Sequence, residues 1–231
     1  MADPIGTAGL YRLLAWLSPG FPTGAFSYSH GLEAAVESGV VRGHASLQNW
    51  IGAVIMSGSG RIDADIVRAA YWAAAQNDLE ALTCANSRGV AFRATAEMAL
   101  ETTAQGAAFL VTCRAAWPDP LLDRWADRLA ERSEAVCCAA AVGAATGRAG
   151  IDVGYASTAY LQAMAANLVS AGLRLGIIGQ TDGQRVLATL EPVIARAAGM
   201  IRGPDQFGSA TFAVELASMA HETQYTRLFR S

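Results

Sequence analysis

The side chains best able to do acid–base or metal chemistry are few and dispersed. Of the three histidines, His30 lies three residues before Glu33, His221 directly precedes Glu222, and His44 has no acidic neighbour. No two histidines are three or four residues apart, the spacing that places two metal ligands on one helix face. The pattern therefore predicts no metal site and no bound cofactor, while transient contact with an ion in passage stays open.

Nucleophile and phosphate-binding motifs are incomplete. Ser27 and Ser29 lie in a Gly- and Phe-rich stretch, but neither has the Gly-x-Ser-x-Gly spacing of a hydrolase nucleophile. Residues 179–184, GQTDGQ, resemble a phosphate loop without its lysine and favour a turn between helices, with Thr181 or Asp182 as cap. All 17 basic residues are arginine, which excludes Schiff-base and P-loop lysine chemistry. Any nucleotide hydrolysis must then come from another polypeptide.

One enzymatic alternative stays open from the residues alone. Scattered polar side chains such as His30, Glu33 and Glu97 could converge in a helical enzyme. Only the three-dimensional arrangement can show whether they meet.

Cysteine usage and the N-terminal residues predict a cytoplasmic protein. Cys84, Cys113, Cys137 and Cys138 form no Cys-x-x-Cys pair, which favours small buried side chains in a reducing compartment. The opening MADPIGTAG lacks the basic and apolar regions of a secretory signal.

Composition indicates a folded chain that buries surface against partners. Hydrophobic residues make up 52% and charged residues 16%, against a charged share of about 25% in typical domains. The net charge of −3 gives no footprint for nucleic acid. Residues 153–173 carry no charge, but their Tyr, Ser, Thr, Gln and Asn content favours a buried central helix over a membrane span.

The elements that must position these residues are helical. No period-2 run of β-branched residues occurs, and no linker divides the chain. The sequence predicts one all-α domain over residues 1–231, with about nine or ten helices. The expected helices include one capped by Ser46 and others over 63–76, 79–87, 90–113, 120–141, 153–173 and 184–198. In 120–141, Leu121, Leu122, Trp125, Leu129 and Val136 form the apolar stripe.

Residues 17–33 form a predicted ordered loop. Its two prolines and its glycines prevent a helix, while Phe21, Phe26 and Tyr28 can anchor it. Ser27 or Ser29 can cap a following helix that reaches Glu37 and ends at Gly39. The loop is either a packed structural element or a surface presented to a partner.

The C-terminal residues have the composition of an interface. Tyr225, Leu228 and Phe229 are spaced to share one helical face, flanked by Arg227 and Arg230. This patch either docks on the protein's own core or orders against a partner.

Three segments carry a resemblance to a known family. They are SPGFPTGAFSYSHGLE at 18–33, residues 167–175 followed by Gly179, Gln180, Thr181 and Gln184, and HETQYTRLFRS at 221–231. In order, spacing and chain length they resemble the UreF family of urease accessory proteins.

The resemblance implies an all-α, non-enzymatic scaffold that forms homodimers. Such proteins bind UreD (also called UreH) and the GTPase UreG, dock on apo-urease and couple GTP hydrolysis to nickel delivery. The resemblance also implies that the tail over 221–231 orders against UreD. A less favoured alternative is a strict GTPase-activating protein that supplies Arg227 or Arg230 as an arginine finger. The expected partner-binding residues are Phe21, Tyr28, His30, Glu33, Gln180, His221, Glu222, Tyr225, Arg227, Leu228, Phe229, Arg230 and Ser231.

Overall fold

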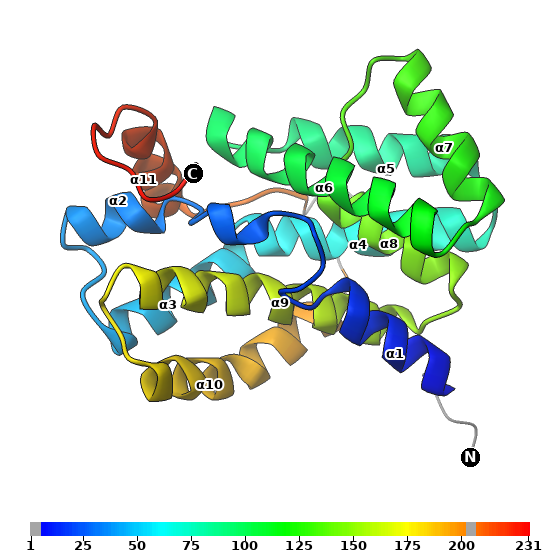
Figure 1. Cartoon of the computed structure of the whole chain (residues 1–231). Helices are drawn as coiled ribbons and strands as arrows, with labels where there is room; N and C mark the ends of the chain where they lie inside the picture. Colours follow the sequence, from blue (N-terminus) through cyan, green and yellow to red (C-terminus); the bar gives the residue numbers. More distant parts are fainter. Residues whose placement is uncertain (1–5, 202–206) are drawn as a thin grey trace. The chain divides into compact units, whose positions relative to one another are not determined.

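The computed structural model describes residues 6–201 and 207–231, and its regular structure is helical (Figure 1). No β-strand occurs within these ranges, which confirms the predicted all-α class. The α-helices are α1 (Gly6–Trp16), α2 (Leu32–Glu37), α3 (His44–Ser57), α4 (Ser59–Ala75), α5 (Leu79–Ala91), α6 (Ala96–Ala116), α7 (Pro120–Glu131), α8 (Cys138–Arg148), α9 (Val153–Arg174), α10 (Gln180–Gly199) and α11 (Phe212–Glu222), and the short 3-10 helix η1 spans Ala25–Ser27.

The chain forms two compact units. Unit 1 comprises Met1–Gly24, Asp63–Phe92 and Thr102–Tyr160, and unit 2 comprises Ala25–Ile62, Arg93–Glu101 and Leu161–Ser231. Helices α4, α6 and α9 each contribute residues to both units. That residues 1–231 act as one domain stays a prediction.

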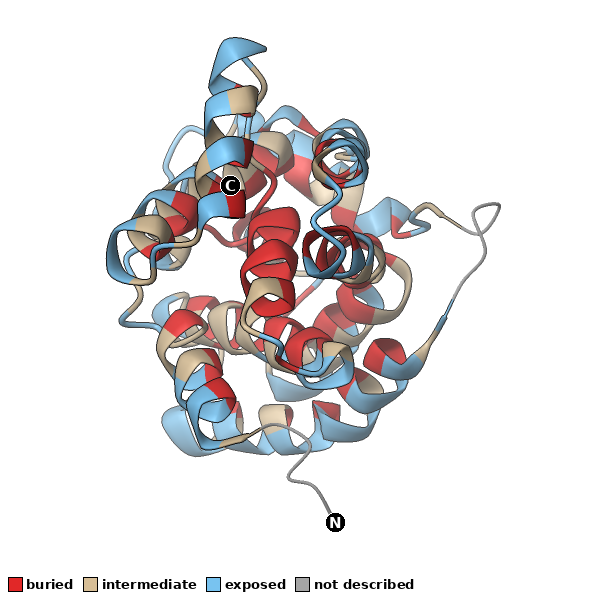
Figure 2. Cartoon of the chain, turned by 90° about the vertical axis from the view of Figure 1, so that its right-hand side faces the viewer, coloured by how far each residue is buried: buried red, intermediate tan, exposed pale blue. Residues whose placement is uncertain are grey.

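The central helix of unit 1 is α8, which packs against α5. Every residue from Cys138 to Gly147 is buried. Figure 2 colours the buried residues of the chain red. Alanine and glycine make this possible, because their small side chains let neighbouring backbones approach. The predicted buried helix at 153–173 is correctly located as α9 but wrong in burial, since Tyr155 and Gln162 are exposed.

Two predicted helices are interrupted. The buried stripe Leu121, Leu122, Trp125 and Leu129 is confirmed, but α7 ends at Glu131 rather than continuing to 141, and Val136 lies in the following loop. Ser133 there has a positive φ of 53°, a conformation that no helix accommodates. The predicted helix over 90–113 is also wrong at its start, because α5 ends at Ala91 and α6 begins at Ala96.

Two helices begin before the residues that the sequence predicts as their N-caps. Helix α3 begins at His44, and Ser46 Oγ in its first turn accepts the N–H groups of Arg42 and Gly43. Helix α10 begins at Gln180 with Gly179 as N-cap, so Thr181 and Asp182 are helical residues rather than caps.

Three of the four cysteines are buried as predicted, whereas Cys84 is exposed. Burial raises the pKa of the Cys113 thiol to about 11.

Unit 2 pairs α3 with α10 and α2 with α11. The prediction for the loop before α2 is confirmed in part: Ser29 Oγ accepts the N–H of Glu33, although the N-cap is Gly31, and the chain turns at Gly39 with a φ of 73°. Of the predicted loop anchors, Tyr28 is buried, whereas Phe26 is 67% exposed, so its predicted anchoring role is wrong. Gly31 has a φ of 77°, and a Cβ at this position would lie 2.9 Å from the backbone nitrogen of Ser218. A glycine is therefore required where α11 lies on α2.

None of the helices within 6–201 and 207–231 has the length and hydropathy needed to cross a bilayer.

Gly143 tests the close packing of α8. A Cβ at Gly143 would lie 2.4 Å from the carbonyl oxygen of Val67. We expect Gly143→Ala to lower the free energy of unfolding by about 1–3 kcal/mol, because overpacking outweighs the gain of about 1 kcal/mol in helix propensity. Gly199→Ala is the matched control, since no atom lies within 4 Å of its added Cβ. Urea denaturation measures both, and equal effects would contradict the packing described.

Candidate functional site

The C-terminal tail, residues 223–231, folds back onto α2 (Figure 1). The backbone N–H groups of Leu228 and Phe229 donate to Glu33 Oε1 and Oε2 at 2.7 and 2.9 Å. The N–H of Arg230 donates to the carbonyl oxygen of Ser27 at 2.8 Å. The tail is not helical, so the shared helical face predicted for Tyr225, Leu228 and Phe229 is wrong. Its backbone N–H groups instead donate hydrogen bonds to residues of α2 and the loop before it.

A buried ionic cluster joins three helices and the tail. His221 of α11 is fully buried, with Nε2 3.0 Å from Glu33 Oε2 of α2 and Nδ1 2.7 Å from Glu97 Oε2 of α6. Arg227 Nη1 of the tail donates to Glu97 Oε1 at 2.8 Å. Each carboxylate thus accepts at both oxygens, which is what a buried charge requires. We call His221, Glu33, Glu97 and Arg227 the histidine cluster.

A second set of polar contacts holds the last residue. Ser231 Oγ donates to Glu101 Oε2 at 3.0 Å, and the Ser231 carbonyl oxygen accepts the N–H and the hydroxyl of Ser29. His30 Nδ1 lies 3.0 Å from the same Glu101 oxygen, and His30 Nε2 lies 2.7 Å from Ser59 Oγ. His30 has a φ of 57°, an uncommon backbone conformation that a non-glycine residue adopts only when its surroundings hold it there.

Burial and charge act in opposite directions on the Glu101 carboxyl. Burial alone would raise its pKa. The charge and hydrogen bond of His30, the hydrogen bond from Ser231 and the charge of Arg93 together lower the pKa below its ordinary value of 4.5. Glu101 is therefore an ionised acceptor that the fold stabilises.

Aromatic rings close the site beneath the tail. Phe229 is buried, and the Arg174 guanidinium carbon lies 4.3 Å from its ring centroid. Tyr28 is also buried, with the Arg230 guanidinium carbon 5.8 Å from its ring centroid and its carbonyl oxygen accepting from Asn167 Nδ2. These cation–π contacts fix the tail by its side chains as well as by its backbone.

The expected partner-binding residues divide by exposure. Tyr28, His30, Glu33, His221, Phe229 and Ser231 are buried within unit 2. Gln180, Glu222, Tyr225, Arg227, Leu228 and Arg230 are exposed, with Tyr225 fully exposed and Leu228 61% exposed. Phe21 lies in unit 1, where its ring centroid is 5.2 Å from that of Phe109. Contact of any of these residues with a partner stays a prediction.

The residues that sequence reasoning missed are those paired over long chain distances. Glu101, Ser59 and Arg174 each contact a residue of the expected partner-binding set, His30 or Phe229. Their spacing in the sequence does not indicate these contacts. His221 pairs with Glu33 and Glu97 rather than with its neighbour Glu222, whose carboxylate accepts the N–H of Ala96. The sequence marks Glu97 only as one of several scattered polar residues. The scattered trio of the enzymatic alternative does not converge at one point, since His30 pairs with Glu101 instead.

The arrangement is suited to holding a peptide segment. Within the described ranges, no group of three His, Cys, Asp or Glu side chains could hold a metal ion. Both ring nitrogens of His30 and of His221 lie within hydrogen-bond distance of a partner in the chain. Chemically, the buried carboxylate of Glu33 accepts the backbone N–H groups of two tail residues, and Glu97 and Glu101 accept hydrogen bonds from side chains.

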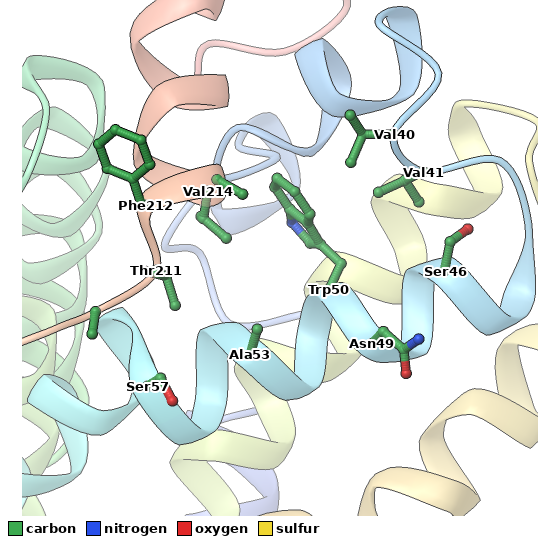
Figure 3. A pocket seen from close by; sticks show the side chains of 12 residues that line it. Val40, Val41, Ser46, Asn49, Trp50, Ala53, Ser57, Thr211, Phe212 and Val214 are labelled. Atoms are coloured by element: carbon green, nitrogen blue, oxygen red, sulfur yellow. The ribbon is translucent and has the colours of Figure 1, made fainter.

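An apolar groove lies beside α11 in the same unit (Figure 3). It has a volume of about 510 Å³ and runs between α3 and the start of α11. Trp50, Val41 and Val214 form much of its apolar lining, and Ser46, Asn49 and Ser57 add polar groups along α3.

The lowered pKa of Glu101 predicts a pH dependence of stability. An ionised Glu101 stabilises the fold above the ordinary pKa of 4.5, and this contribution is lost as the pH falls through the lower folded value. Glu101→Gln should therefore destabilise the chain more at pH 6 than at pH 3.5. Urea denaturation at both pH values measures the difference. A destabilisation that is the same at both would show that the Glu101 charge contributes nothing.

Comparisons with known proteins cover almost the entire chain. The family model for UreF matches residues 41–191. Urease accessory protein UreF of Granulibacter bethesdensis is 46% identical over 228 residues, 98% of this chain and 95% of that protein. Urease accessory protein UreF of Rhodopseudomonas palustris (strain BisB5) is 47% identical over 97% of this chain and 92% of that protein. Urease accessory protein UreF of Azorhizobium caulinodans is 46% identical over 100% of this chain and 99% of that protein. This chain therefore belongs to the UreF family of urease accessory proteins.

Proposed function

We propose that this chain is a non-enzymatic scaffold that holds UreD (UreH) and the GTPase UreG on apo-urease while nickel is inserted. Membership of the UreF family gives it a role in urease maturation. GTP hydrolysis is then carried out by UreG, because this chain has no lysine and no phosphate loop. Nickel is cargo in this process, and the chain needs no resident cofactor.

The anchored tail is the observation that carries the proposal. Glu33 and Glu97 fix the backbone and Arg227, while Tyr225 and Leu228 remain in solvent. Exposed tyrosine and leucine side chains on a fixed backbone lose little conformational entropy when they bind, so they are favourable anchors for a partner. This arrangement supports UreD as the protein that binds the tail.

Two further parts of the proposal rest on composition and family. The charged share of only 16% and exposed apolar residues such as Tyr11 and Leu14 of α1 support a homodimer within a larger assembly. The role of the family in urease maturation supports a cytoplasmic location.

The arginine-finger alternative makes a different kinetic prediction. Arg227 is paired with Glu97, and Arg230 lies over Tyr28, so both guanidinium groups already have contacts within the chain. Loss of an arginine finger costs about 10³–10⁵ in the rate of GTP hydrolysis. Single-turnover hydrolysis by UreG in the assembled complex, with Arg227→Ala or Arg230→Ala in place of the native chain, separates the two functions. A scaffold retains the rate, whereas a loss of that size would establish the finger.

Tail variants test the proposed UreD interface. We expect Leu228→Ala and Tyr225→Ala each to weaken binding to UreD by about 30-fold, the loss typical of an interface anchor worth about 2 kcal/mol. Both side chains are exposed, so thermal stability should not change. Thr226→Ala, at an exposed position on the same tail, is the matched control and should bind normally. Calorimetric titration with purified UreD measures the affinity, and unchanged affinity in both variants would refute tail binding.

A further inference from the structure

Arg174, the last residue of α9, lies over the ring of Phe229 in the tail. Its guanidinium carbon is 4.3 Å from the ring centroid, and its Nε donates to the carbonyl oxygen of Ser170 at 3.4 Å. The N–H groups on Nη1 and Nη2 have no hydrogen-bond acceptor among the described residues. Partial desolvation lowers the pKa of this guanidinium, which nonetheless stays charged. Arg174 is thus a positioned cation that no carboxylate of residues 6–201 or 207–231 pairs with.

Arg230 of the tail is held in a similar way over Tyr28. Its guanidinium carbon is 5.8 Å from the Tyr28 ring centroid, and its backbone N–H donates to the carbonyl oxygen of Ser27. Like Arg174, it is exposed and forms no ion pair within the described part of the chain. Cation–π attraction holds a guanidinium without using its N–H groups, so these groups stay available as donors. We call Arg174 and Arg230 the arginine patch.

Contacts with α9 bring the two arginines to one surface of unit 2. Asn167 and Arg174 are seven residues apart on α9, which is two turns and about 10 Å. Asn167 Nδ2 donates to the carbonyl oxygen of Tyr28, while Arg174 lies over Phe229. Because Phe229 and Arg230 are consecutive and Arg230 lies over Tyr28, both guanidinium groups lie beside the same stretch of α9.

The segments that build this surface contain no acidic residue. Neither Asp nor Glu occurs in residues 153–174 of α9, in residues 25–31 before α2 or in the tail, 223–231. The three glutamates that the tail contacts already accept hydrogen bonds from it. The whole chain has a net charge of −3, so this surface is locally positive on an acidic protein. Such a surface attracts a negatively charged partner.

Exposed apolar side chains flank the patch in the sequence. Phe26, two residues before Tyr28, is 67% exposed, and Leu228, two residues before Arg230, is 61% exposed. Arginine among exposed aromatic and aliphatic side chains is typical of the centre of a protein–protein interface. Because the rings already position the guanidinium groups, little side-chain entropy is lost when carboxylates bind. The surface therefore suits a protein segment that carries Asp or Glu better than a free anion.

We propose that the arginine patch binds an acidic segment of the partner that the tail engages. Each guanidinium pairs with an aspartate or glutamate carboxylate of that segment through two parallel N–H groups. The inference rests on the proposed function, because it assigns this segment to UreD. It adds charged contacts to those made by Tyr225 and Leu228, and it gives UreD binding a dependence on salt.

Calorimetric titration with purified UreD tests the patch through its charge. Arg174→Met and Arg230→Met keep an unbranched side chain over the ring but remove the charge, so each should weaken binding about tenfold with little change in thermal stability. The double variant should also lose most of the decline in affinity that the native chain shows between about 0.05 and 0.5 M NaCl. Arg185→Met is the matched control and should bind normally, since Arg185 of α10 is already paired with Asp182.

The outcomes separate this inference from the proposed function. Weaker binding in Leu228→Ala and Tyr225→Ala, with native affinity and salt dependence in the double arginine variant, would refute the patch alone. Unchanged affinity in the tail variants and in the arginine variants would refute the interface with UreD, and the patch with it.

A zero-length cross-link identifies the acidic segment directly. The chain contains no lysine, so Arg174→Lys and Arg230→Lys each introduce the only side-chain amine. A carbodiimide joins a carboxylate to an amine in contact with it as an amide, and itself takes up the water that is lost. Mass spectrometry should find an Asp or Glu of UreD joined to position 174 or 230, and none joined to position 185 in Arg185→Lys. Cross-links missing from both patch variants, in complexes that bind UreD normally, would overturn the proposal.

Discussion

The carboxylate of Glu33 is the acceptor on which the C-terminal structure of unit 2 depends. It accepts the N–H groups of two consecutive tail residues, Leu228 and Phe229, and faces His221 on its remaining side. A buried carboxylate without such donors is strongly destabilising, so α2, α11 and the tail must form together. Gly31 makes this possible, because its lack of a Cβ lets the backbone of α11 lie against the start of α2.

The same constraint explains why the tail combines buried and exposed residues. Glu97 holds Arg227 and Glu101 holds Ser231, so three glutamates fix the tail at successive points. Phe229 lies in the interior under Arg174, while Tyr225 and Leu228 stay in solvent. The chain thus presents exposed side chains from a backbone that its own buried charges hold.

Helical class and most helices could be predicted from the sequence, because periodic apolar residues such as Leu122, Trp125 and Leu129 mark a buried face. The positions that failed are those where tertiary packing decides. Alanine and glycine in α8 carry no periodic signal, yet every residue from Cys138 to Gly147 is buried. Ser133, with its positive φ, lies between Leu129 and Val136, so the predicted apolar stripe does not continue. Two of the three motifs that identify the family contain Glu33 and His221, which the structure brings together. Their pairing could not be predicted, because His221 lies 188 and 124 residues from Glu33 and Glu97.

A thermodynamic cycle between Glu33 and the tail tests this central role most directly. It compares the unfolding free energies of the full chain, Glu33→Gln, a chain lacking Arg227–Ser231, and the two changes combined. Because the truncated chain has already lost the Leu228 and Phe229 donors, Glu33→Gln should cost at least about 1 kcal/mol less there than in the full chain. If Glu33→Gln costs the same with and without the tail, the carboxylate does not hold it, and the structure described for this site is contradicted.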